Sequence, residues 1–360
     1  MPLCWIDVLT PKQAMFTSKL APKLESSGFD VEITTRKYRE AEELAKRLGL
    51  NARPVGRHGG GSLRGKLEAS IERTMLLTKL ASELRPDVLV SFASVEAARV
   101  AYGLGIPQLI LCDSPHAEAV VRLTVPLAQK LLTPWVIPKD AWTCYGISEE
   151  RIIHYRALDP WVWLKDLRNG SEKILEELGL DSSLPLVVCR VAESQAAYLL
   201  GDAPEVGVAP RILRLLSTLE EDFNLVVVPR YESQISELRR LVGSRSVVVD
   251  YVIDGPRLLK NCSVFIGSGG TMNTEAALLG VPTLTYFPHK PYIIQRFLMD
   301  WGLVYGASKP EKLVEMVRRI LRDLDEYREM HKIKAEALVS EMEDPLPKVV
   351  SVLKSILGLS

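Results

Sequence analysis

Short apolar runs alternate with longer amphipathic segments along most of the 360-residue chain. The runs are rich in Val, Ile and Leu and have the length of buried strands, and the segments between them carry apolar residues at helical spacing. In the first half we expect strands at Leu3–Leu9, Val31–Thr34, Val88–Phe92 and Gln108–Cys112. In the second half we expect strands at Leu186–Cys189, Leu225–Val228, Val247–Val249, Val264–Ile266 and Thr283–Tyr286. The alternation predicts an α/β protein whose parallel sheets are covered by helices on both faces.

The pattern is interrupted at residues 157–170, ALDPWVWLKDLRNG, which contain proline and glycine and show no clear periodicity. A chain of 360 residues also exceeds what one hydrophobic core usually spans. We therefore expect two doubly wound domains, residues 1–165 and 166–345, followed by a last helix within residues 346–360.

The segment Val264–Pro282 predicts a strand, a glycine-rich turn at Gly267–Thr271 and a helix. A helix N-terminus directs unpaired backbone amides and about half a positive charge toward an anion. Gly269 and Gly270 would let a diphosphate approach the backbone closely, and Glu275, about one turn into the helix, would accept hydrogen bonds from a ribose diol. The same pattern also occurs in α/β domains as plain structure, so glycines alone do not prove a ligand site.

A second segment, CDSPHAEAVVR, begins at the end of the predicted strand Gln108–Cys112 and carries several ionisable side chains. We expect Asp113 and His116 at the carboxyl end of that strand and a helix over His116–Arg122. Acidic and imidazole groups at such an edge suit acid and base chemistry, so Asp113, His116 and Glu118 are the candidate catalytic residues. The alternative is a helix cap formed by Asp113 or its neighbouring serine.

Composition narrows the class of protein. The 45 basic and 45 acidic residues cancel, which argues against nucleic acid as a partner because phosphate-backbone binding needs a positive excess. The five cysteines are scattered, which predicts buried free thiols in a reducing compartment. We find no signal peptide and no run of about 18 apolar residues, so we expect a cytoplasmic protein without a transmembrane segment. No carboxylate cluster indicates a metal site, and we expect no required cofactor.

The run of Ser268, Gly269, Gly270 and Thr271, with Glu275 after it, resembles the donor-nucleotide segment of GT-B glycosyltransferases. The likeness is strongest to the GlcNAc transferase that makes the second lipid intermediate of peptidoglycan. This resemblance implies that the serine and glycine amides contact a diphosphate and that the glutamate holds the ribose.

The downstream segment FPHKPYIIQRF is also similar to that family. Its His289, Lys290 and Gln295 match residues that line the donor-sugar pocket there. The resemblance therefore adds these three residues to the expected donor site.

The spacing of His116, Glu118 and Arg122 resembles the HxEAGxR segment of UDP-GlcNAc 2-epimerases, which share the GT-B fold. The sequence departs from that family at Val120, which replaces a glycine. A larger departure is residues 91–94, Ser-Phe-Ala-Ser, which stand where epimerases carry HGDT with an aspartate used in acid or base chemistry. Epimerisation is therefore the less favoured reaction.

Two arginines of the second half are further candidates for binding phosphate. Arg190 lies in CRVAESQ, which resembles the HRRES segment of the epimerases, and Arg230 follows the next predicted strand. Either guanidinium could neutralise a leaving diphosphate. Either could equally be an ordinary surface arginine.

Two segments of the first half bear on the acceptor. Gly60–Lys66 fits GxxxxGK, but Leu67 follows where a P-loop needs Ser or Thr, so we reject a Walker motif. The basic side chains around it could meet an acidic acceptor, or the segment is a solvated loop. Residues 119–138 carry a long apolar stripe with basic residues, which could cradle a lipid carrier, although core packing is the simpler interpretation.

The segments LTPKQ, SPHAEAVVRLTVPL, ALDPWVWLK and GSGGTMNTEAALLGVP identify the chain as a member of an uncharacterised, largely archaeal domain-of-unknown-function family, number 354, with GT-B relatives. This resemblance implies two Rossmann-like domains facing a cleft, with residues 346–360 crossing back to the first domain. The activity it favours is a glycosyltransferase with a nucleotide sugar, a UDP-sugar above all, as donor substrate. The alternatives are a 2-epimerase and a non-catalytic nucleotide-sugar-binding protein. The acceptor is unidentified, with a lipid-linked one among the candidates, and an oligomer is open.

Overall fold

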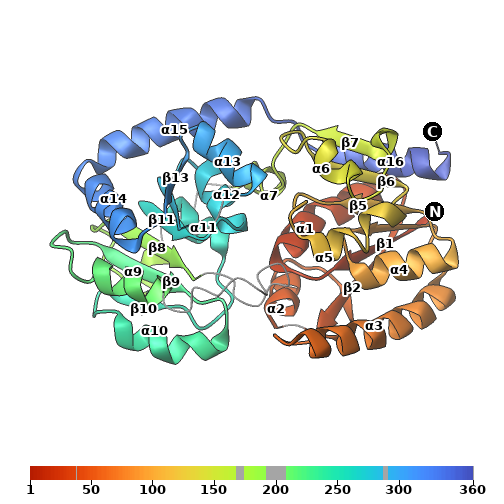
Figure 1. Cartoon of the computed structure of the whole chain (residues 1–360), viewed down its shortest axis with the longest axis horizontal. Helices are drawn as coiled ribbons and strands as arrows, with labels where there is room; N and C mark the ends of the chain where they lie inside the picture. Colours follow the sequence, from red (N-terminus) through yellow and green to blue (C-terminus); the bar gives the residue numbers. More distant parts are fainter. Residues whose placement is uncertain (38, 168–173, 192–207, 287–290, 360) are drawn as a thin grey trace. The chain divides into compact units, whose positions relative to one another are not determined.

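The computed structural model describes residues 1–37, 39–167, 174–191, 208–286 and 291–359. The chain forms two compact units, each built on one parallel sheet (Figure 1). Unit 1 consists of Met1–Trp163 and the chain from Glu343 onward, and unit 2 of the described residues between Leu164 and Met342. Helix α7 (Trp161–Leu164) lies where the chain passes from one unit to the other. The predicted α/β class with parallel sheets is confirmed.

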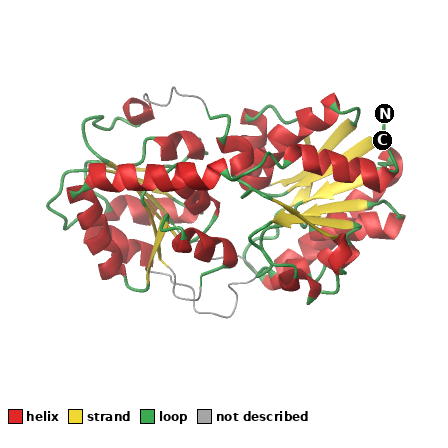
Figure 2. Cartoon of the chain, turned by 90° about the horizontal axis from the view of Figure 1, so that it is seen from above, coloured by secondary structure: helices red, strands yellow, loops and turns green. Residues whose placement is uncertain are grey.

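Unit 1 contains a seven-stranded sheet, here called sheet A. In their order across the sheet, its strands are β3 (Ala52–Arg57), β2 (Asp30–Lys37), β1 (Leu3–Val8), β4 (Val88–Ser91), β5 (Gln108–Leu111), β6 (Lys130–Pro134) and β7 (Ile152–Tyr155). Its helices are α1 (Pro11–Ser26), α2 (Arg39–Arg47), α3 (Leu63–Leu84), α4 (Val95–Leu104), α5 (Glu118–Val121), α6 (Asp140–Thr143) and α16 (Leu346–Leu357). Helices flank both faces of the sheet (Figure 2).

Unit 2 contains a six-stranded sheet, here called sheet B. Its strands, again in order across the sheet, are β10 (Ser246–Val248), β9 (Asn224–Val228), β8 (Leu186–Arg190), β11 (Val264–Gly267), β12 (Thr283–Tyr286) and β13 (Val304–Ala307). Its helices are α8 (Ile174–Glu177), α9 (Val208–Leu216), α10 (Ile235–Leu241), α11 (Gly255–Lys260), α12 (Thr271–Leu278), α13 (Ile293–Asp300), α14 (Pro310–Arg322) and α15 (Leu324–Ser340). Apolar cores on the two faces of this sheet are built around residues such as Val187 and Val188, which point to opposite sides.

Four of the observed strands were not predicted from the sequence: β3, β6, β7 and β13. β3 is an edge strand that contains Pro54 and Gly56 and has one buried residue in six, so it lacks an apolar run. β6 lies within residues 119–138, whose apolar stripe is not one helix. That segment divides into α5, a 3₁₀ turn at Val125–Leu127 and β6, and core packing accounts for most of its apolar residues.

The turn from β1 into α1 is held by a helix cap. Thr10 Oγ1 accepts a hydrogen bond from the backbone N–H of Gln13 (3.4 Å), and Pro11 occupies the first turn of the helix. Gln13 Nε2 also donates to the carbonyl oxygen of Phe92, just beyond β4 (3.3 Å). The start of α1 is thereby tied to the neighbouring strand end, and this fixes where Lys12 lies.

A buried ion pair fastens α3 to the middle of sheet A. The Arg73 guanidinium donates to both carboxylate oxygens of Asp7 on β1, at 2.6 and 3.1 Å, and to the carbonyl oxygen of Val55 (3.0 Å). Thr34 donates to the same carboxylate at 2.6 Å. A Cβ atom at Gly56, where φ is +72°, would lie 2.9 Å from the Arg73 side chain, so this position requires glycine.

The five cysteines are free thiols, as predicted. Cys4, Cys189 and Cys262 are buried, and Cys112 is half-buried. Cys144 is exposed, so the prediction that the thiols are buried is wrong for it, because it ends the short helix α6 at the surface.

His331 of α15 is fully buried in unit 2 against Tyr305 of β13, with His331 Nε2 3.0 Å from the tyrosine hydroxyl. Burial, together with the nearby Lys334 charge, lowers the pKa of His331 to about 4. Below pH 6.5 the unfolded chain therefore binds a proton that the folded chain does not.

We expect the free energy of unfolding to fall as the pH drops from 6.5 to 4, and His331→Gln to make this fall shallower. The glutamine keeps a polar partner for Tyr305 and does not titrate. Urea unfolding at a series of pH values measures the slope. An identical slope in both proteins would contradict the assignment.

Candidate functional site

Charged side chains meet at the carboxyl edge of sheet A. Asp113 follows β5, Asp159 follows β7, and Lys12 lies in the first turn of α1, just after β1. Because all strands of the sheet are parallel, these segments lie at the same edge. The expectation that Asp113 lies at this edge is met, and the structure adds Lys12 and Asp159.

Lys12 joins the two carboxylates. Its ammonium forms ion pairs with Asp113 and with Asp159, the latter at 2.6 Å. Ser114 Oγ donates to the second oxygen of Asp113 (2.9 Å), and the Tyr155 hydroxyl donates to the second oxygen of Asp159. The Lys12 and Asp113 side chains are 19% and 20% exposed and Asp159 only 4%, so the cluster is reachable from its Asp113 side.

The two carboxylates have pKa values displaced in opposite directions. Burial opposes ionisation of Asp113, but the Lys12 charge and hydrogen bonds from Lys12 and Ser114 bring its pKa below the ordinary value. Burial raises the pKa of Asp159 although the Lys12 charge acts against the shift, and the charge of Asp113 adds to the rise. Opposite displacements in one cluster are the arrangement that separates an acid from a base.

His116 lies in the loop after β5, near the same cluster. Burial, with a smaller contribution from the Lys12 charge, lowers the pKa of His116 to about 4 against the opposing charge of Asp113. The imidazole is therefore neutral at pH 7. The predicted helix begins only at Glu118, so His116 is on a loop.

Glu118 does not belong to this cluster. Its side chain is 59% exposed and pairs with Arg122 at 2.6 Å, one turn along α5. The capping alternative fails as well, because the residue before the helix is Ala117 and no side chain caps it. Asp113 is thus free of a capping role.

The residues that replace the epimerase HGDT segment have structural roles. Ser94 caps α4 by accepting from the N–H of Ala97 (3.3 Å), and Ala93 has a φ of +57°, which lets the chain turn sharply after β4. Ser62 likewise caps α3, accepting from the N–H of Gly65 (3.1 Å). The glycine-rich segment before α3 is therefore a helix entrance, and Lys66 lies inside that helix.

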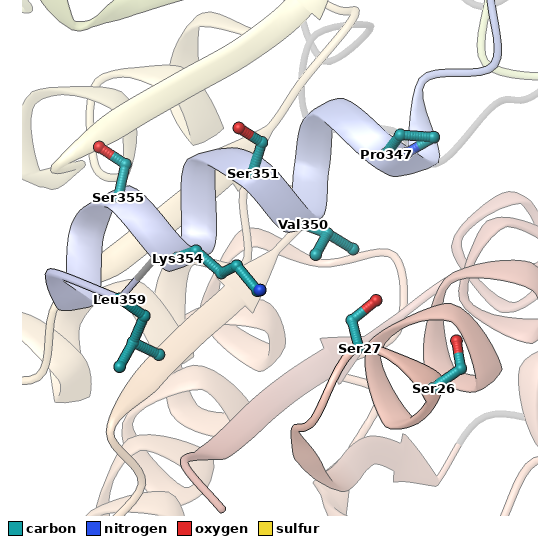
Figure 3. Close-up of a pocket in the computed structure, with 8 residues that line it drawn as sticks. All are labelled: Ser26, Ser27, Pro347, Val350, Ser351, Lys354, Ser355 and Leu359. Atoms are coloured by element: carbon teal, nitrogen blue, oxygen red, sulfur yellow. The ribbon is translucent and has the colours of Figure 1, made fainter.

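A separate hollow of about 680 Å³ lies between α1 and α16 (Figure 3). Ser26 and Ser27 at the end of α1 and Lys354 of α16 line part of it. Since α1 starts at the carboxyl edge of sheet A, its end lies toward the opposite edge. This hollow is therefore remote from the Lys12 cluster.

In unit 2, the turn predicted to bind a diphosphate connects β11 to α12. Gly269 adopts a φ of +83°, which favours glycine. Its backbone N–H is not unpaired as expected, because it donates to Asn273 Oδ1 at 2.9 Å. Gly267 must also be glycine, since a Cβ atom there would collide with the same Asn273 oxygen.

The next amides of this turn have no hydrogen-bond partner among the described residues. In the described part of the chain no hydrogen bond involves the N–H of Gly270, Thr271 or Met272. A Cβ atom added at Gly270, where φ is −85°, would meet nothing within 4 Å. The start of α12 is therefore open to a ligand. Of the amides predicted at Ser268–Thr271, that of Gly269 is engaged by Asn273, those of Gly270 and Thr271 remain, and that of Met272 is added.

Polar side chains are buried behind this turn. Gln295 of α13 donates to Thr274 Oγ1 of α12 at 3.3 Å, and both residues are buried. Among the described residues, Gln295 Oε1 and Asn273 Nδ2 are buried without a hydrogen-bond partner. Glu275 is 4% exposed, with its carboxylate near Gly255 at the start of α11.

Arg190 and Arg230 lie at the ends of the neighbouring strands β8 and β9. The Arg190 guanidinium donates to the carbonyl oxygen of Pro229 at 2.5 Å, which brings it beside the second strand end. The backbone N–H of Arg230 donates to Gln234 Oε1 (2.9 Å). The predicted residues His289 and Lys290 lie outside the described residues.

Among the described residues, two features that would indicate other functions are absent. No group of three His, Cys, Asp or Glu side chains is arranged to hold a metal ion. No described helix combines the length and the apolar character needed to cross a membrane.

The sequence matches a known protein family. The model of a family described as a protein of unknown function, DUF354, matches residues 3–353. The uncharacterized protein MJ0665 of Methanocaldococcus jannaschii is 32% identical over 317 residues, which cover 87% of this chain and 90% of that protein.

Solved structures share the fold over nearly the whole chain. MnaA of S. aureus in complex with UDP has a TM-score of 0.79 and 13% identity, covering 100% of this chain and 98% of its own. UDP-GlcNAc 2-epimerase from Neisseria meningitidis bound to UDP-GlcNAc has a TM-score of 0.73 and 15% identity, covering 99% of each chain. The spinosyn forosaminyltransferase SpnP has a TM-score of 0.63 and 19% identity, again covering 99% of each chain. The chain has the GT-B fold, as predicted.

We expect Lys12→Met to lower the free energy of unfolding by about 3 kcal/mol at pH 7.5, because it leaves two largely buried carboxylates without their counter-charge. The loss should shrink toward pH 5, as the unpaired carboxylates take up protons. Adding Asp159→Asn to Lys12→Met should recover part of the stability, since it removes one of the charges. Urea unfolding at both pH values tests this, and a loss independent of pH would show that Lys12 acts only through packing.

Proposed function

This chain belongs to the DUF354 family of proteins of unknown function, and we propose that it is a glycosyltransferase that uses a nucleoside-diphosphate sugar. Its donor is a UDP-sugar, bound by unit 2. Unit 1 supplies the base that activates the acceptor hydroxyl. The names of the similar structures support the choice of donor, since one contains UDP and another UDP-GlcNAc.

The donor's diphosphate binds at the start of α12. The N–H groups of Gly270, Thr271 and Met272 are the donors, and the helix N-terminus favours the negative charge. Arg190, at the next strand end, adds positive charge to the departing diphosphate. Glu275 takes the ribose, as the resemblance implies.

His116 acts as the base, and Asp113 favours the imidazolium that forms. The acceptor oxygen loses its proton to the neutral imidazole and bonds to the anomeric carbon of the sugar. The bond from that carbon to the β-phosphate oxygen breaks, and UDP leaves with the electron pair. The reaction needs no redox partner, and positioning with general base catalysis accounts for the chemistry.

The single observation that carries this proposal is the convergence of Lys12, Asp113, Asp159 and His116 at the carboxyl edge of sheet A. Ligands of doubly wound sheets bind at that edge. Burying two carboxylates and an imidazole together costs free energy that the fold alone does not require. Such a cluster, with carboxylate pKa values shifted in opposite directions, therefore indicates a functional site.

A second candidate is 2-epimerisation by elimination and re-addition of the diphosphate, which a specific observation favours. The sequence lacks the HGDT aspartate, but Asp159 places another carboxylate with a raised pKa at the same edge. Asp113 and Asp159 would then serve as base and acid. The TM-score to the Neisseria meningitidis UDP-GlcNAc 2-epimerase, 0.73, is also higher than that to SpnP, 0.63.

We expect Gly270→Ala to weaken UDP binding about tenfold without changing the melting temperature of the free protein. The new methyl group has open space around it in the free protein and obstructs a diphosphate at the amides. The control is Gly243→Ala, which also adds a methyl group to open space, away from the turn.

The measurement is the melting temperature against a panel of nucleoside diphosphates and their sugar conjugates. A ligand at 100 times its dissociation constant adds about 2.7 kcal/mol of stability. Equal shifts in wild type and Gly270→Ala would remove the turn from the site. No shift with any member of the panel would remove the nucleotide-sugar function.

We expect His116→Ala to lower the rate of sugar transfer roughly 100-fold or more while UDP affinity stays unchanged. The reason is that His116 acts on the acceptor and the nucleotide binds to the other unit. The rate is measured as release of UDP in the presence of acceptor. A parallel incubation in D₂O without acceptor separates the candidates: deuterium at C2 of the sugar would favour epimerisation, and binding without transfer or exchange would favour a non-catalytic binding protein.

A further inference from the structure

The carboxamide of Asn273, in the first turn of α12, lies behind the glycine turn that precedes this helix. Its Oδ1 accepts the hydrogen bond from the N–H of Gly269 at 2.9 Å, and the residue is 2% exposed. Gly267 leaves room for it, because a Cβ atom at that position would collide with the same oxygen. The side chain is therefore held between the end of β11 and the start of α12.

Only one end of this carboxamide is used. Among the described residues, Asn273 Nδ2 is buried without a hydrogen-bond partner. An unpaired buried donor costs free energy, and the bond made by Oδ1 offsets that cost only in part. The turn needs the oxygen of this side chain, so the nitrogen requires another explanation.

An aspartate at this position would satisfy the same turn. A carboxylate oxygen accepts from the Gly269 amide as Oδ1 does, and a charged acceptor forms the stronger bond. Asn273 is the third residue of α12, where the helix dipole favours acidic side chains. Burial opposes a charge there, but Nδ2 makes no hydrogen bond that an oxygen in its place would break. The local structure thus gives no reason for the amide.

The two side chains differ in how they act on a ligand. The N–H groups of Gly270, Thr271 and Met272 stand open just before Asn273 in the chain. A carboxylate at 273 would lie within one helical turn of an anion held by these amides, in a buried place where charges are poorly screened, and would repel it. Glu275, which is 4% exposed, already adds one carboxylate to this helix. A neutral side chain at 273 leaves the start of α12 attractive to an anion.

We propose that Asn273 determines the charge of the ligand that the α12 turn accepts. Its oxygen fixes the Gly269 amide and with it the conformation of the turn. Because it is an amide, it leaves the positive end of the helix to the ligand. Asn273 acts through Gly269 and through space, without touching the ligand, so it is a positioning residue. The inference rests on the proposed diphosphate site and adds that Asn273 selects for the anionic part of the ligand.

Asn273→Asp tests the proposal, because it introduces a charge and keeps the size of the side chain. Ligand-observed NMR titration of the full chain measures the dissociation constants of UDP, UMP and uridine. We expect the variant to bind UDP about 100-fold and UMP about tenfold more weakly than the wild type, since the repulsion grows with the charge of the ligand. Uridine, which is neutral, should bind to both proteins equally.

The matched control is Asn261→Asp. It makes the same change of charge in the same unit, at a half-buried asparagine that ends α11 just before β11. Since the α12 turn follows the other end of β11, this charge lies at the opposite edge of sheet B. Asn261→Asp should bind UDP as the wild type does.

Failure of the proposed function and failure of this inference give different results. A wild type that binds none of the three ligands would remove the donor site, and the role of Asn273 with it. A wild type that binds UDP, together with an Asn273→Asp variant that binds it equally well, would overturn the role of Asn273 alone. An equal loss of affinity for UDP and uridine would also overturn it, because it would show a structural role. So would an Asn273→Asp variant that circular dichroism shows to be unfolded, since the fold itself would then require the amide.

Discussion

Lys12 is the group on which the arrangement of unit 1 at its carboxyl edge depends. One ammonium neutralises carboxylates from two strand ends, β5 and β7, that are not adjacent in the sheet. Without it, Asp113 and Asp159 would repel each other in a largely buried place, and one of them would have to be protonated. With it, the two carboxylates share one counter-charge, and their pKa values are displaced in opposite directions. The same lysine also helps to keep His116 neutral. The electrostatics of the candidate site thus follow from one side chain.

A residue of this site could be predicted from the sequence only where the strand before it was recognised. Asp113 follows an apolar run that is easily recognised, and its position at the sheet edge could be expected. Asp159 follows β7, a short strand interrupted by His154, which gives no apolar run and was missed. Its partner Tyr155 is part of the same strand and was missed with it. Lys12 lies in the first turn of a helix, and a pattern along the chain carries no information about which distant carboxylates a lysine meets.

In unit 2 the local geometry was predictable and the pairing of individual amides was not. Strand, glycine turn and helix all lie close to where the sequence indicates, since Gly269 and Gly280 mark positions with positive φ. The side chain of Asn273, however, folds back to occupy the Gly269 amide. Asparagine commonly competes for backbone donors near a helix start, and whether it does so depends on the space that Gly267 leaves. That space exists only because a Cβ atom is absent at that position.

The fold supports both candidate reactions. The choice between them therefore depends on which groups of the cluster can accept or donate a proton. Glycosyl transfer needs one base, which the neutral His116 supplies. Epimerisation by elimination needs a base and an acid, and the only carboxylate of the cluster whose pKa is raised is Asp159. Asp159 is 4% exposed and has both oxygens engaged, one by Lys12 and one by Tyr155. A group so enclosed can stabilise charge on its neighbours, but it can exchange a proton with a sugar only if Lys12 moves away. The more accessible groups, Asp113 and His116, are sufficient for transfer, and this is the physical reason for ranking transfer first.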